Sequence, residues 1–427
     1  MPAALDALRA EARALDAADE LAEFRDAFLL PPGPDGSPAV YLCGNSLGLQ
    51  PLGVRRALER ELDDWARLGV EGHFHAENPW FSYHEPLKAP LARLVGALPV
   101  EVSIMAGLTS SLHTLLVSFY APAGKRTKIL YEGGAFPSDR YALASHARLH
   151  GLDPDETLVA LQPRPGAHTL ETDDVCAQIA ALGDSLALVM IGGVHYYTGQ
   201  LHDIEQITAA GHAVGARVGW DLAHAAGNVP LQLHDWNVDF AAFCSYKYLN
   251  SGPGSAAGIF VHERWAQSPE LQRLAGWWGN DPERRFSMPE RFEPARGADG
   301  WQQSNAPVFA IAPLRASLAL FDRASMSALR AKSERLTGLL ERALLAVVPE
   351  GALEIITPRD PAARGCQLSL HLPAHGEALH AALTEAGVVC DFRRPSVIRL
   401  APVPLYNRFE EVVQVAAIFE RLLGAAP

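Results

Sequence analysis

The chain has 427 residues, of which 48% are hydrophobic and 20% charged, and its formal net charge at pH 7 is −13. This length allows one large domain and a smaller one, and the composition is ordinary for a globular protein. The acidic balance and the lack of a basic run argue against a nucleic-acid partner. No uninterrupted apolar run reaches the length of a transmembrane helix, so we expect no membrane contact.

The cysteines and histidines predict no metal site. Five scattered cysteines lack C-x-x-C spacing and suggest neither a zinc site nor a disulfide framework. His73, His75 and His84 lie close in sequence but form no helical ligand pair with a supporting carboxylate. The N-terminal residues have an amphipathic pattern rather than that of a signal peptide, and we therefore expect a cytoplasmic location.

The first part of the chain divides into a helical segment and an α/β domain. Residues 3–29 have the spacing of two short helices, and the break PPGPDGSP then closes a segment that we place at residues 1–40. From about residue 100 to residue 260, apolar strands alternate with amphipathic helices. This pattern predicts a mostly parallel sheet with right-handed crossovers, in a large domain over residues 41–310.

The remaining residues predict a smaller α+β domain. A long helix pair at 308–348 leads to strands around a helix at 376–386, and we place this domain at residues 311–427. Within it, Arg399 lies in the apolar strand VIRLAP and needs an anionic partner. That partner is either a structural acid or the carboxylate of a substrate.

The stretch from 219 to 258 contains the most informative residues. Two apolar runs, at 216–220 and 238–244, predict strands that end in Asp221 and just before Lys247. Ligands bind at the carboxyl ends of strands in open α/β sheets, so both side chains should face one crevice. A lysine amine and a carboxylate suit pyridoxal 5'-phosphate (PLP), whose aldehyde and ring nitrogen they engage. Alternatively, Asp221 caps a helix and Lys247 is a solvated lysine.

Two further positions have both a structural and a functional interpretation. Thr109 ends a Gly-Leu-Thr turn before an apolar helix from about Ser110, where free N–H groups could bind a phosphate, although threonine is also a common N-cap. Phe136 follows the apolar strand KILYEGG and would ordinarily be a core residue. No G-x-G-x-x-G follows a strand with a suitably spaced acid, which disfavours a dinucleotide-binding fold.

The stretch WDLAHAAGNVPLQLHDWNVDFAAFCSYKYLNSGPG closely resembles kynureninases, which are PLP enzymes of fold type I in the class-V aminotransferase-like group. The resemblance extends in register over residues of about 40–410. It includes the motifs YLCGNSLGLQP, AGLTSSLHTLL, EGGAFPSDRYA, GVHYYTGQ, GWWGN, SNAPVF and RLAPVPLYN. At the end of one core strand the chain departs from the family, because Gly192-Gly193 stands where members often have a small hydroxyl residue.

The resemblance implies hydrolysis of L-kynurenine, and of 3-hydroxy-L-kynurenine, to anthranilate or 3-hydroxyanthranilate and L-alanine. This cleavage of the Cβ–Cγ bond belongs to tryptophan catabolism, in the kynurenine pathway toward NAD biosynthesis. It also implies a homodimer with shared active sites, because the Trp/Gly loops of the family reach the neighbouring subunit's site.

The resemblance further assigns the site residues. The implied catalytic residues are Lys247 as the Schiff-base lysine, Asp221 as the partner of the pyridinium, and Tyr246, which either transfers a proton or holds phosphate. The other implied cofactor contacts are Leu108, Thr109, Phe136, Pro137, Ser138, Asp139, His224, Asn305 and Trp277, with Trp278 fitting equally well. The implied substrate contacts are Arg399, His73, Ser46 and Asn305.

Two alternatives remain open from the sequence. The first is another class-V PLP enzyme, a cysteine desulfurase or an aminotransferase. A desulfurase needs a mobile nucleophilic cysteine, and none of the five cysteines lies in an evident catalytic loop. The second is a catalytically silent PLP-fold scaffold, which the intact Asp221, Lys247 and Arg399 disfavour.

Overall fold

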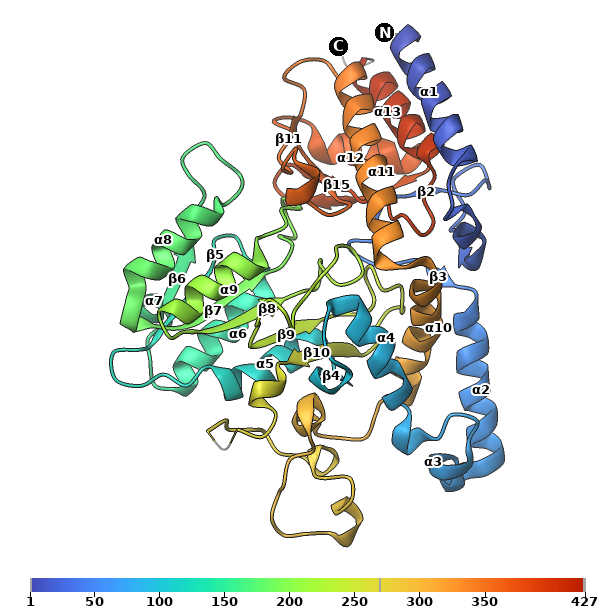
Figure 1. Ribbon diagram of the computed structural model, residues 1–427. Coiled ribbons are helices and arrows are strands. Elements are labelled where there is room, and N and C mark those ends of the chain that lie inside the picture. Colours follow the sequence, from blue (N-terminus) through green and yellow to red (C-terminus); the bar gives the residue numbers. More distant parts are fainter. Residues whose placement is uncertain (1, 269, 425–427) are drawn as a thin grey trace.

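The computed structural model describes residues 2–268 and 270–424 and shows a large α/β unit beside a smaller α+β unit (Figure 1). The large sheet has seven strands in the order β4-β10-β9-β8-β7-β5-β6. Its strands are β4 (Val102–Met105), β5 (Lys128–Glu132), β6 (Leu158–Leu161), β7 (Leu186–Gly192), β8 (Arg217–Asp221), β9 (Phe240–Phe243) and β10 (Ala257–Val261).

Five of these strands run parallel, from β9 through β8, β7 and β5 to β6. The expected mostly parallel sheet is therefore confirmed, and so are the two predicted strands at 216–220 and 238–244. β10 departs from the pattern because it is antiparallel to both of its neighbours, β4 and β9. All seven residues of β7 are buried, as expected of a strand covered on both faces by helices.

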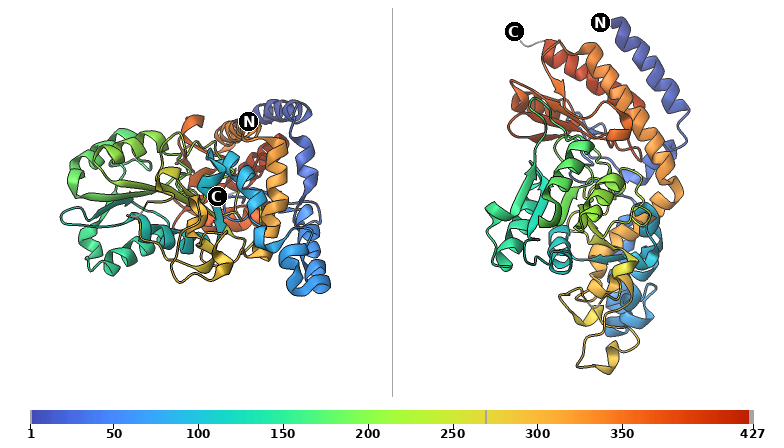
Figure 2. Two further views of the ribbon diagram at one scale, coloured as in Figure 1. Left: turned by 60° about the horizontal axis from the view of Figure 1, so that its bottom comes forward. Right: turned by 60° about the vertical axis from the view of Figure 1, so that its left-hand side comes forward.

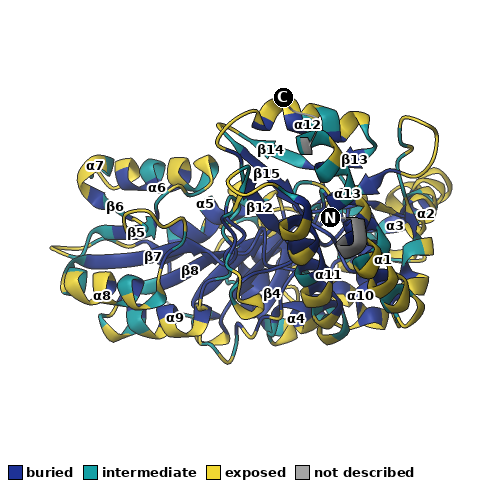
Figure 3. Cartoon of the chain, turned by 90° about the horizontal axis from the view of Figure 1, so that it is seen from above, coloured by how far each residue is buried: buried dark blue, intermediate teal, exposed yellow. Residues whose placement is uncertain are grey.

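Helices cover both faces of this sheet. Figure 3 shows α5 and α6 on one side, with α4, α8 and α9 on the other. α2 and α10 pack against each other at the end of the sheet nearest β4 (Figure 1). The helices of this unit are α2 (Gly53–Leu68), α3 (Gly72–His75), α4 (Glu85–Val95), α5 (Leu108–Phe119), α6 (Pro137–Leu149), α7 (Pro154–Thr157), α8 (Thr172–Leu182), α9 (Ile204–Ala213) and α10 (Val308–Ala324).

The small unit is an antiparallel sheet in the order β11-β12-β15-β14, covered by helices. Its elements are α11 (Met326–Val347), β11 (Glu354–Ile355), β12 (Leu368–His371), α12 (Gly376–Glu385), β13 (Val388–Val389), β14 (Asp391–Arg393), β15 (Val397–Leu400) and α13 (Phe409–Gly424). A core of Leu, Val, Ile and Phe side chains from these elements is separate from the two apolar clusters of the large sheet.

The N-terminal segment packs against the small unit. α1 (Pro2–Ala17) contacts α11 and α13, and β2 (Val40–Tyr41) pairs in parallel with β13. A short ribbon of β1 (Phe28–Leu29) and β3 (Gln50–Pro51) then connects it to the large unit. We retain the division into residues 1–40, 41–310 and 311–427 as a proposal. Among the described helices, none has both the length and the apolar character that a membrane crossing requires.

Aromatic packing beneath the sheet fixes the positions of three functional elements. The ring of Phe240 in β9 stacks on Phe119 of α5, with centroids 4.5 Å apart. On β8, a Cβ added at Gly219 would lie only 2.1 Å from Phe240 Cζ. The glycine therefore allows the ring to lie against the β8 backbone, two residues before Asp221.

We predict that Gly219→Ala lowers the melting temperature of the protein. Phe240 cannot retreat because Phe119 lies against it, and overpacking of this kind costs about 1–3 kcal/mol of stability. Gly338→Ala in α11 is the matched control, because a Cβ there would have no neighbour within 4 Å. That change should preserve or slightly raise the melting temperature. Equal melting temperatures for the two variants would contradict this packing.

Candidate functional site

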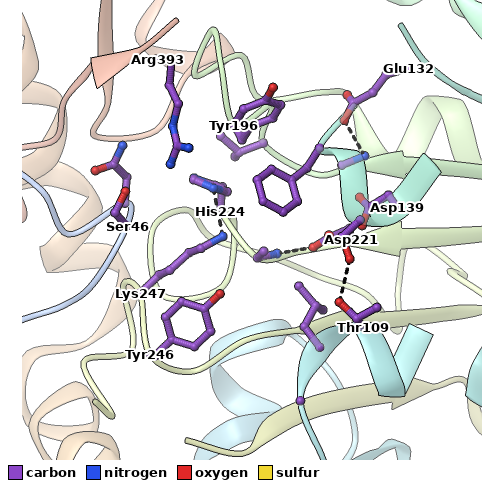
Figure 4. A pocket seen from close by; sticks show the side chains of 18 of the residues that line it. Ser46, Thr109, Glu132, Asp139, Tyr196, Asp221, His224, Tyr246, Lys247 and Arg393 are labelled. Carbon is purple, nitrogen blue, oxygen red and sulfur yellow. Dashed lines mark hydrogen bonds between the residues drawn. The ribbon is translucent and has the colours of Figure 1, made fainter. Parts of the chain in front are cut away.

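A cavity of about 360 Å³ lies where the large and small units meet, beside the carboxyl ends of the parallel strands (Figure 4). Side chains from β5, β8 and the loop after β9 border it, together with the first residues of α5 and α6 and one residue of β14. Residues singled out from the sequence that line it are Ser46, Leu108, Thr109, Phe136, Ser138, Asp139, Asp221, His224, Tyr246 and Lys247.

Lys247 and His224 are in direct contact in this cavity. The Nζ atom of Lys247 is 3.1 Å from Nε2 of His224, which is buried. Burial, and then the positive charge of Lys247, lowers the pKa of His224 well below its usual range. The imidazole is therefore neutral and accepts from the lysine. Its Nδ1 atom is buried without a hydrogen-bond partner among the described residues, so it is available to a bound group.

Two acidic side chains, Asp221 and Asp139, lie close together in the same cavity (Figure 4). Asp221 is buried at the end of β8, and its Oδ1 accepts from the Ala223 amide at 2.7 Å. Removal from water, followed by the negative charge of Asp221, raises the pKa of Asp139 well above its usual range. Burial also raises the pKa of Asp221, while Lys247 opposes that shift. We infer that Asp139 carries the proton and donates it to an ionised Asp221.

A third acid, Glu132, lines the cavity and was missed in the sequence. It ends β5 and is buried, accepting from the Gly192 amide at 3.3 Å and lying 3.2 Å from Nε2 of His202. Burial would raise the pKa of Glu132, but His195 and His202 hold it below its usual value. A Cβ at Gly192 would lie 2.8 Å from Glu132 Oε1. A side chain at position 192 would therefore require Glu132 to move.

The N-termini of two helices, α5 and α6, meet at one end of the cavity. α5 starts after Gly107 and α6 after Phe136, and neither helix has a side-chain cap. The hydroxyls of Thr109 and Ser138 connect the two helices at 2.8 Å. Uncapped N–H groups and the helix dipoles favour an anion such as a phosphate. Thr109 is therefore not the N-cap of α5, and Pro137 is the first residue of α6, beside the lining.

The alternative interpretations of Phe136 and Asp221 are not supported. Phe136 is 45% exposed and contacts Tyr196 edge-on, with centroids 5.3 Å apart, so it is not a core residue. In the described chain, a turn rather than a helix follows Asp221. The buried acid, the lysine, the exposed ring and the anion site together fit a phosphorylated pyridine aldehyde such as PLP.

The small unit contributes a cluster of two arginines and one acid. Arg399 is buried and does not line the cavity; its Nε and Nη2 atoms lie 3.0 and 2.9 Å from the two Asp391 oxygens. Its Nη1 donates to the Tyr196 carbonyl at 2.7 Å, and Nη2 donates to Ser46 Oγ at 3.1 Å. The structural acid considered for Arg399 is thus present. Arg393, which the sequence reasoning overlooked, lines the cavity instead.

The remaining predicted residues do not line this cavity; α3 and the segment before α10, which carry them, lie at the lower edge of the molecule (Figures 1 and 2). The His73 ring stacks on Phe81, with centroids 4.6 Å apart, and Phe81 stacks in turn on Trp278. Trp278 is 1% exposed whereas Trp277 is 40% exposed, so only Trp277 could readily reach another molecule. Asn305 is also exposed.

We predict that Asp139→Asn stabilises the cofactor-free protein increasingly as pH rises. A raised pKa means that the folded chain keeps a proton that the unfolded chain loses above about pH 4. Binding of this proton stabilises the folded parent at low pH, and the stabilisation falls as pH rises toward the folded pKa. An asparagine needs no proton. The difference in melting temperature between variant and parent should therefore grow from pH 5 to pH 8.

Asp63→Asn is the control for Asp139→Asn, because Asp63 is an exposed aspartate of α2 and its substitution makes the same exchange of a carboxyl for an amide. Its melting temperature should differ from that of the parent by a similar amount at both pH values. If Asp139→Asn were less stable than the parent to the same extent at pH 5 and pH 8, the proton would not reside on Asp139.

Comparison with solved structures shows the fold. The cysteine desulfurase CsdA from Escherichia coli matches with a TM-score of 0.76 at 18% identity, covering 96% of this chain and 99% of its own. The C-DES mutant K223A, which has glycine covalently linked to the PLP cofactor, matches with a TM-score of 0.75 at 19% identity, covering 93% and 99%. This is the fold-type-I architecture of PLP enzymes.

Sequence comparison shows the family. The model of the kynureninase C-terminal domain matches residues 329–419. The kynureninase of Myxococcus xanthus is 55% identical over 409 residues, which is 96% of each chain. Those of Flavobacterium johnsoniae and Salinispora tropica are 51% and 55% identical, covering 97% and 95% of this chain and 98% and 95% of their own. With such identity over nearly its whole length, the chain belongs to the kynureninase family.

Proposed function

We infer that this chain is a kynureninase, which hydrolyses L-kynurenine to anthranilate and L-alanine. The observation that carries this inference is full-length kinship at 49–55% identity to proteins of that name. The cavity agrees with it, because a lysine, a buried acid and an anion site line one space large enough for a cofactor and an amino acid. The kinship also places the reaction in tryptophan catabolism.

The cofactor that this site fits is PLP, which when bound withdraws electrons from the substrate Cα and so permits cleavage of the Cβ–Cγ bond. Its phosphate would lie against the N-termini of α5 and α6, between Thr109 and Ser138. Phe136, at the same edge, would face its ring. Asp221 would accept a hydrogen bond from the ring nitrogen and keep that nitrogen protonated.

Asp139 keeps Asp221 in the required charge state. Because Asp139 holds the proton and donates it, Asp221 can remain an anion although it is buried. The charge of Lys247 acts in the same direction. An anion at Asp221 is the form that pairs with a protonated ring nitrogen, so this pair of acids sets the electronic state of the cofactor.

Lys247 is the proposed attachment residue and carries protons at the substrate Cα. Neutral His224 lies 3.1 Å from Nζ and holds the amine in place without adding a second positive charge. The Gly48 amide donates to the Tyr246 carbonyl at 2.8 Å, and a Cβ at Gly48 would lie 2.3 Å from the Lys247 carbonyl. The loop that carries Ser46 is thereby fixed against the lysine.

Tyr246 and Arg399 complete the proposed set. Burial, and then the nearby Cys244, raises the pKa of Tyr246, so at neutral pH it is a proton donor rather than a base. It can donate to the substrate carbonyl oxygen or to the phosphate, and both remain open. Arg399, which donates to Ser46, is the residue that we propose to orient the α-carboxylate, although Asp391 offsets its charge.

The desulfurase alternative is disfavoured by the lining of the cavity. No cysteine is among the described lining residues, and Cys244, two residues before Tyr246, is buried. The desulfurases that share this fold are less than 20% identical to the chain, whereas the kynureninases are about half identical. All five cysteines are free thiols, which supports the proposed cytoplasmic location.

We further propose a homodimer in which each subunit completes its partner's site. Trp277 and Asn305 are exposed on adjoining loops, since the Gly276 position lies against Gln303 with no room for a Cβ. The exposed ring of Phe286 contacts Trp277 edge-on, with centroids 5.4 Å apart, and the apolar side chain of Met288 is also exposed. A patch of this kind is typical of a protein interface.

The same arrangement supports acceptance of 3-hydroxy-L-kynurenine. Within one chain His73 and Asn305 lie outside the cavity, so in a shared site they would reach the substrate of the neighbouring subunit. His73 has a buried Nδ1 without a partner among the described residues. An imidazole and an amide there offer hydrogen bonds to a ring hydroxyl that apolar side chains would not offer.

The first test is turnover of L-kynurenine by the purified protein loaded with PLP. Borohydride reduction followed by peptide mapping should label Lys247, because it is the lysine that lines the cavity. Lys247→Ala should lose about 100- to 10,000-fold of the activity, as expected when a group that transfers protons is removed. A parent without turnover, or a label on another lysine, would contradict the proposal.

We predict that mixing the inactive variants Lys247→Ala and Asn305→Ala restores part of the activity. A hybrid dimer would contain one site with an intact lysine from one subunit and an intact asparagine from the other. Lys247→Ala mixed with Asp221→Asn is the control and should restore nothing, because these two residues line the same cavity of one chain. Equal recovery in both mixtures, or an active monomer, would contradict shared sites.

A further inference from the structure

The two arginines of the small unit differ in what they can offer a ligand. Arg399 donates three hydrogen bonds, to Asp391, to Ser46 and to the Tyr196 carbonyl, and its Nη2 also lies 2.9 Å from the second Asp391 oxygen. Arg393 donates a hydrogen bond from Nη2 to one oxygen of the same carboxylate at 3.1 Å, and its Nε lies 2.9 Å from the other oxygen without forming a hydrogen bond. Its Nη1 has no acceptor among the described residues, and its side chain extends into the cavity (Figure 4).

The charge of this cluster depends on Arg393. Arg399 and Asp391 form a bidentate ion pair whose net charge is zero, since a guanidinium is always protonated and burial does not prevent Asp391 from ionising. The hydroxyl of Ser46 donates to Asp391 at 2.6 Å and adds no charge. The second guanidinium therefore leaves the cluster with one positive charge, which matches a single carboxylate.

The position of Arg393 is compatible with that ligand. The anion site formed by α5 and α6 lies at the far side of the cavity from Arg393, with Lys247 and Asp221 between them (Figure 4). An amino-acid substrate carries its carboxylate on the same carbon as the amine that reacts beside Lys247. The carboxylate must therefore lie close to the lysine but away from the phosphate, which is the side where Arg393 extends.

We propose that Arg393 is a second substrate-binding residue, which binds the α-carboxylate together with Arg399 and supplies the net positive charge of that site. Asp391 is the positioning residue that holds both guanidiniums side by side. This proposal rests on the proposed function, since it assumes that the substrate is an α-amino acid bound beside Lys247.

The test compares L-kynurenine with its carboxamide, in which a neutral amide replaces the α-carboxylate. Parent, Arg393→Gln and Arg393→Lys are loaded with PLP. Binding is measured by titrating the visible absorbance of the cofactor, and KM and kcat are measured separately. Arg394→Gln is the matched control, because Arg394 is adjacent but exposed and pairs with the exposed Glu377 at 3.0 Å.

In Arg393→Gln we expect KM and the dissociation constant for kynurenine to rise about 10- to 100-fold, as for the loss of a charged hydrogen bond. Binding of the carboxamide should change little, so the preference for the acid over the amide should largely disappear. Arg393→Lys should recover part of the preference for the acid over the amide, because lysine restores the positive charge but not the bidentate geometry of the guanidinium. Arg394→Gln should behave like the parent.

An unchanged preference in Arg393→Gln would overturn the proposal and leave the carboxylate to Arg399 alone. An equal loss for acid and amide would overturn it as well, because the effect would then be structural. A parent that fails to hydrolyse kynurenine would instead contradict the proposed function. The two failures are therefore distinguishable within one set of measurements.

Discussion

The site depends on keeping charged groups away from water, beside partners that offset the lost hydration. A buried and unpaired carboxylate costs several kcal/mol, and three acids border this cavity. Glu132 is stabilised by His202 and a backbone amide, and Asp221 by an amide and the charge of Lys247. Asp139 avoids the cost by remaining protonated. The partners of each acid therefore determine its protonation state, and the protonation states determine what the cavity can bind.

Apolar packing below the cavity gives these groups their positions. Phe240 of β9 lies between Gly219 of β8 and Phe119 of α5, so the three elements cannot shift independently. β8 carries Asp221, the loop after β9 carries Lys247, and the first turn of α5 carries the anion site. The chemistry of a few polar residues thus depends on one close contact between aromatic rings and a glycine backbone.

Much of this arrangement could be predicted from the sequence, because strand ends in an α/β sheet meet at one edge. The strands and a helix from about Ser110 follow from periodicity, and the grouping of Asp221 with Lys247 follows from their positions after strands; the helix begins two residues earlier, at Leu108. The direction of β10 had a signal that was overlooked, since no crossover helix separates it from β9. Glu132 ends the strand β5 and so had the same signal as Asp221, which was overlooked, whereas Arg393 gave no such signal. Arg393 and Arg394 are adjacent in sequence, and only the fold directs the first into the cavity and the second to Glu377.

The proposed anion sites at the two ends of the cavity differ in kind, and the difference suits one ligand that stays bound and one that leaves. Helix N-termini provide fixed backbone N–H groups at the α5 and α6 end, which suits a phosphate that remains through many reaction cycles. Side-chain guanidiniums at the other end suit a carboxylate that must leave with the product L-alanine. Two free arginines would hold that product tightly. Asp391 neutralises one of the two charges, so the proposed carboxylate site keeps the bidentate geometry needed for orientation while its net attraction remains that of one charge.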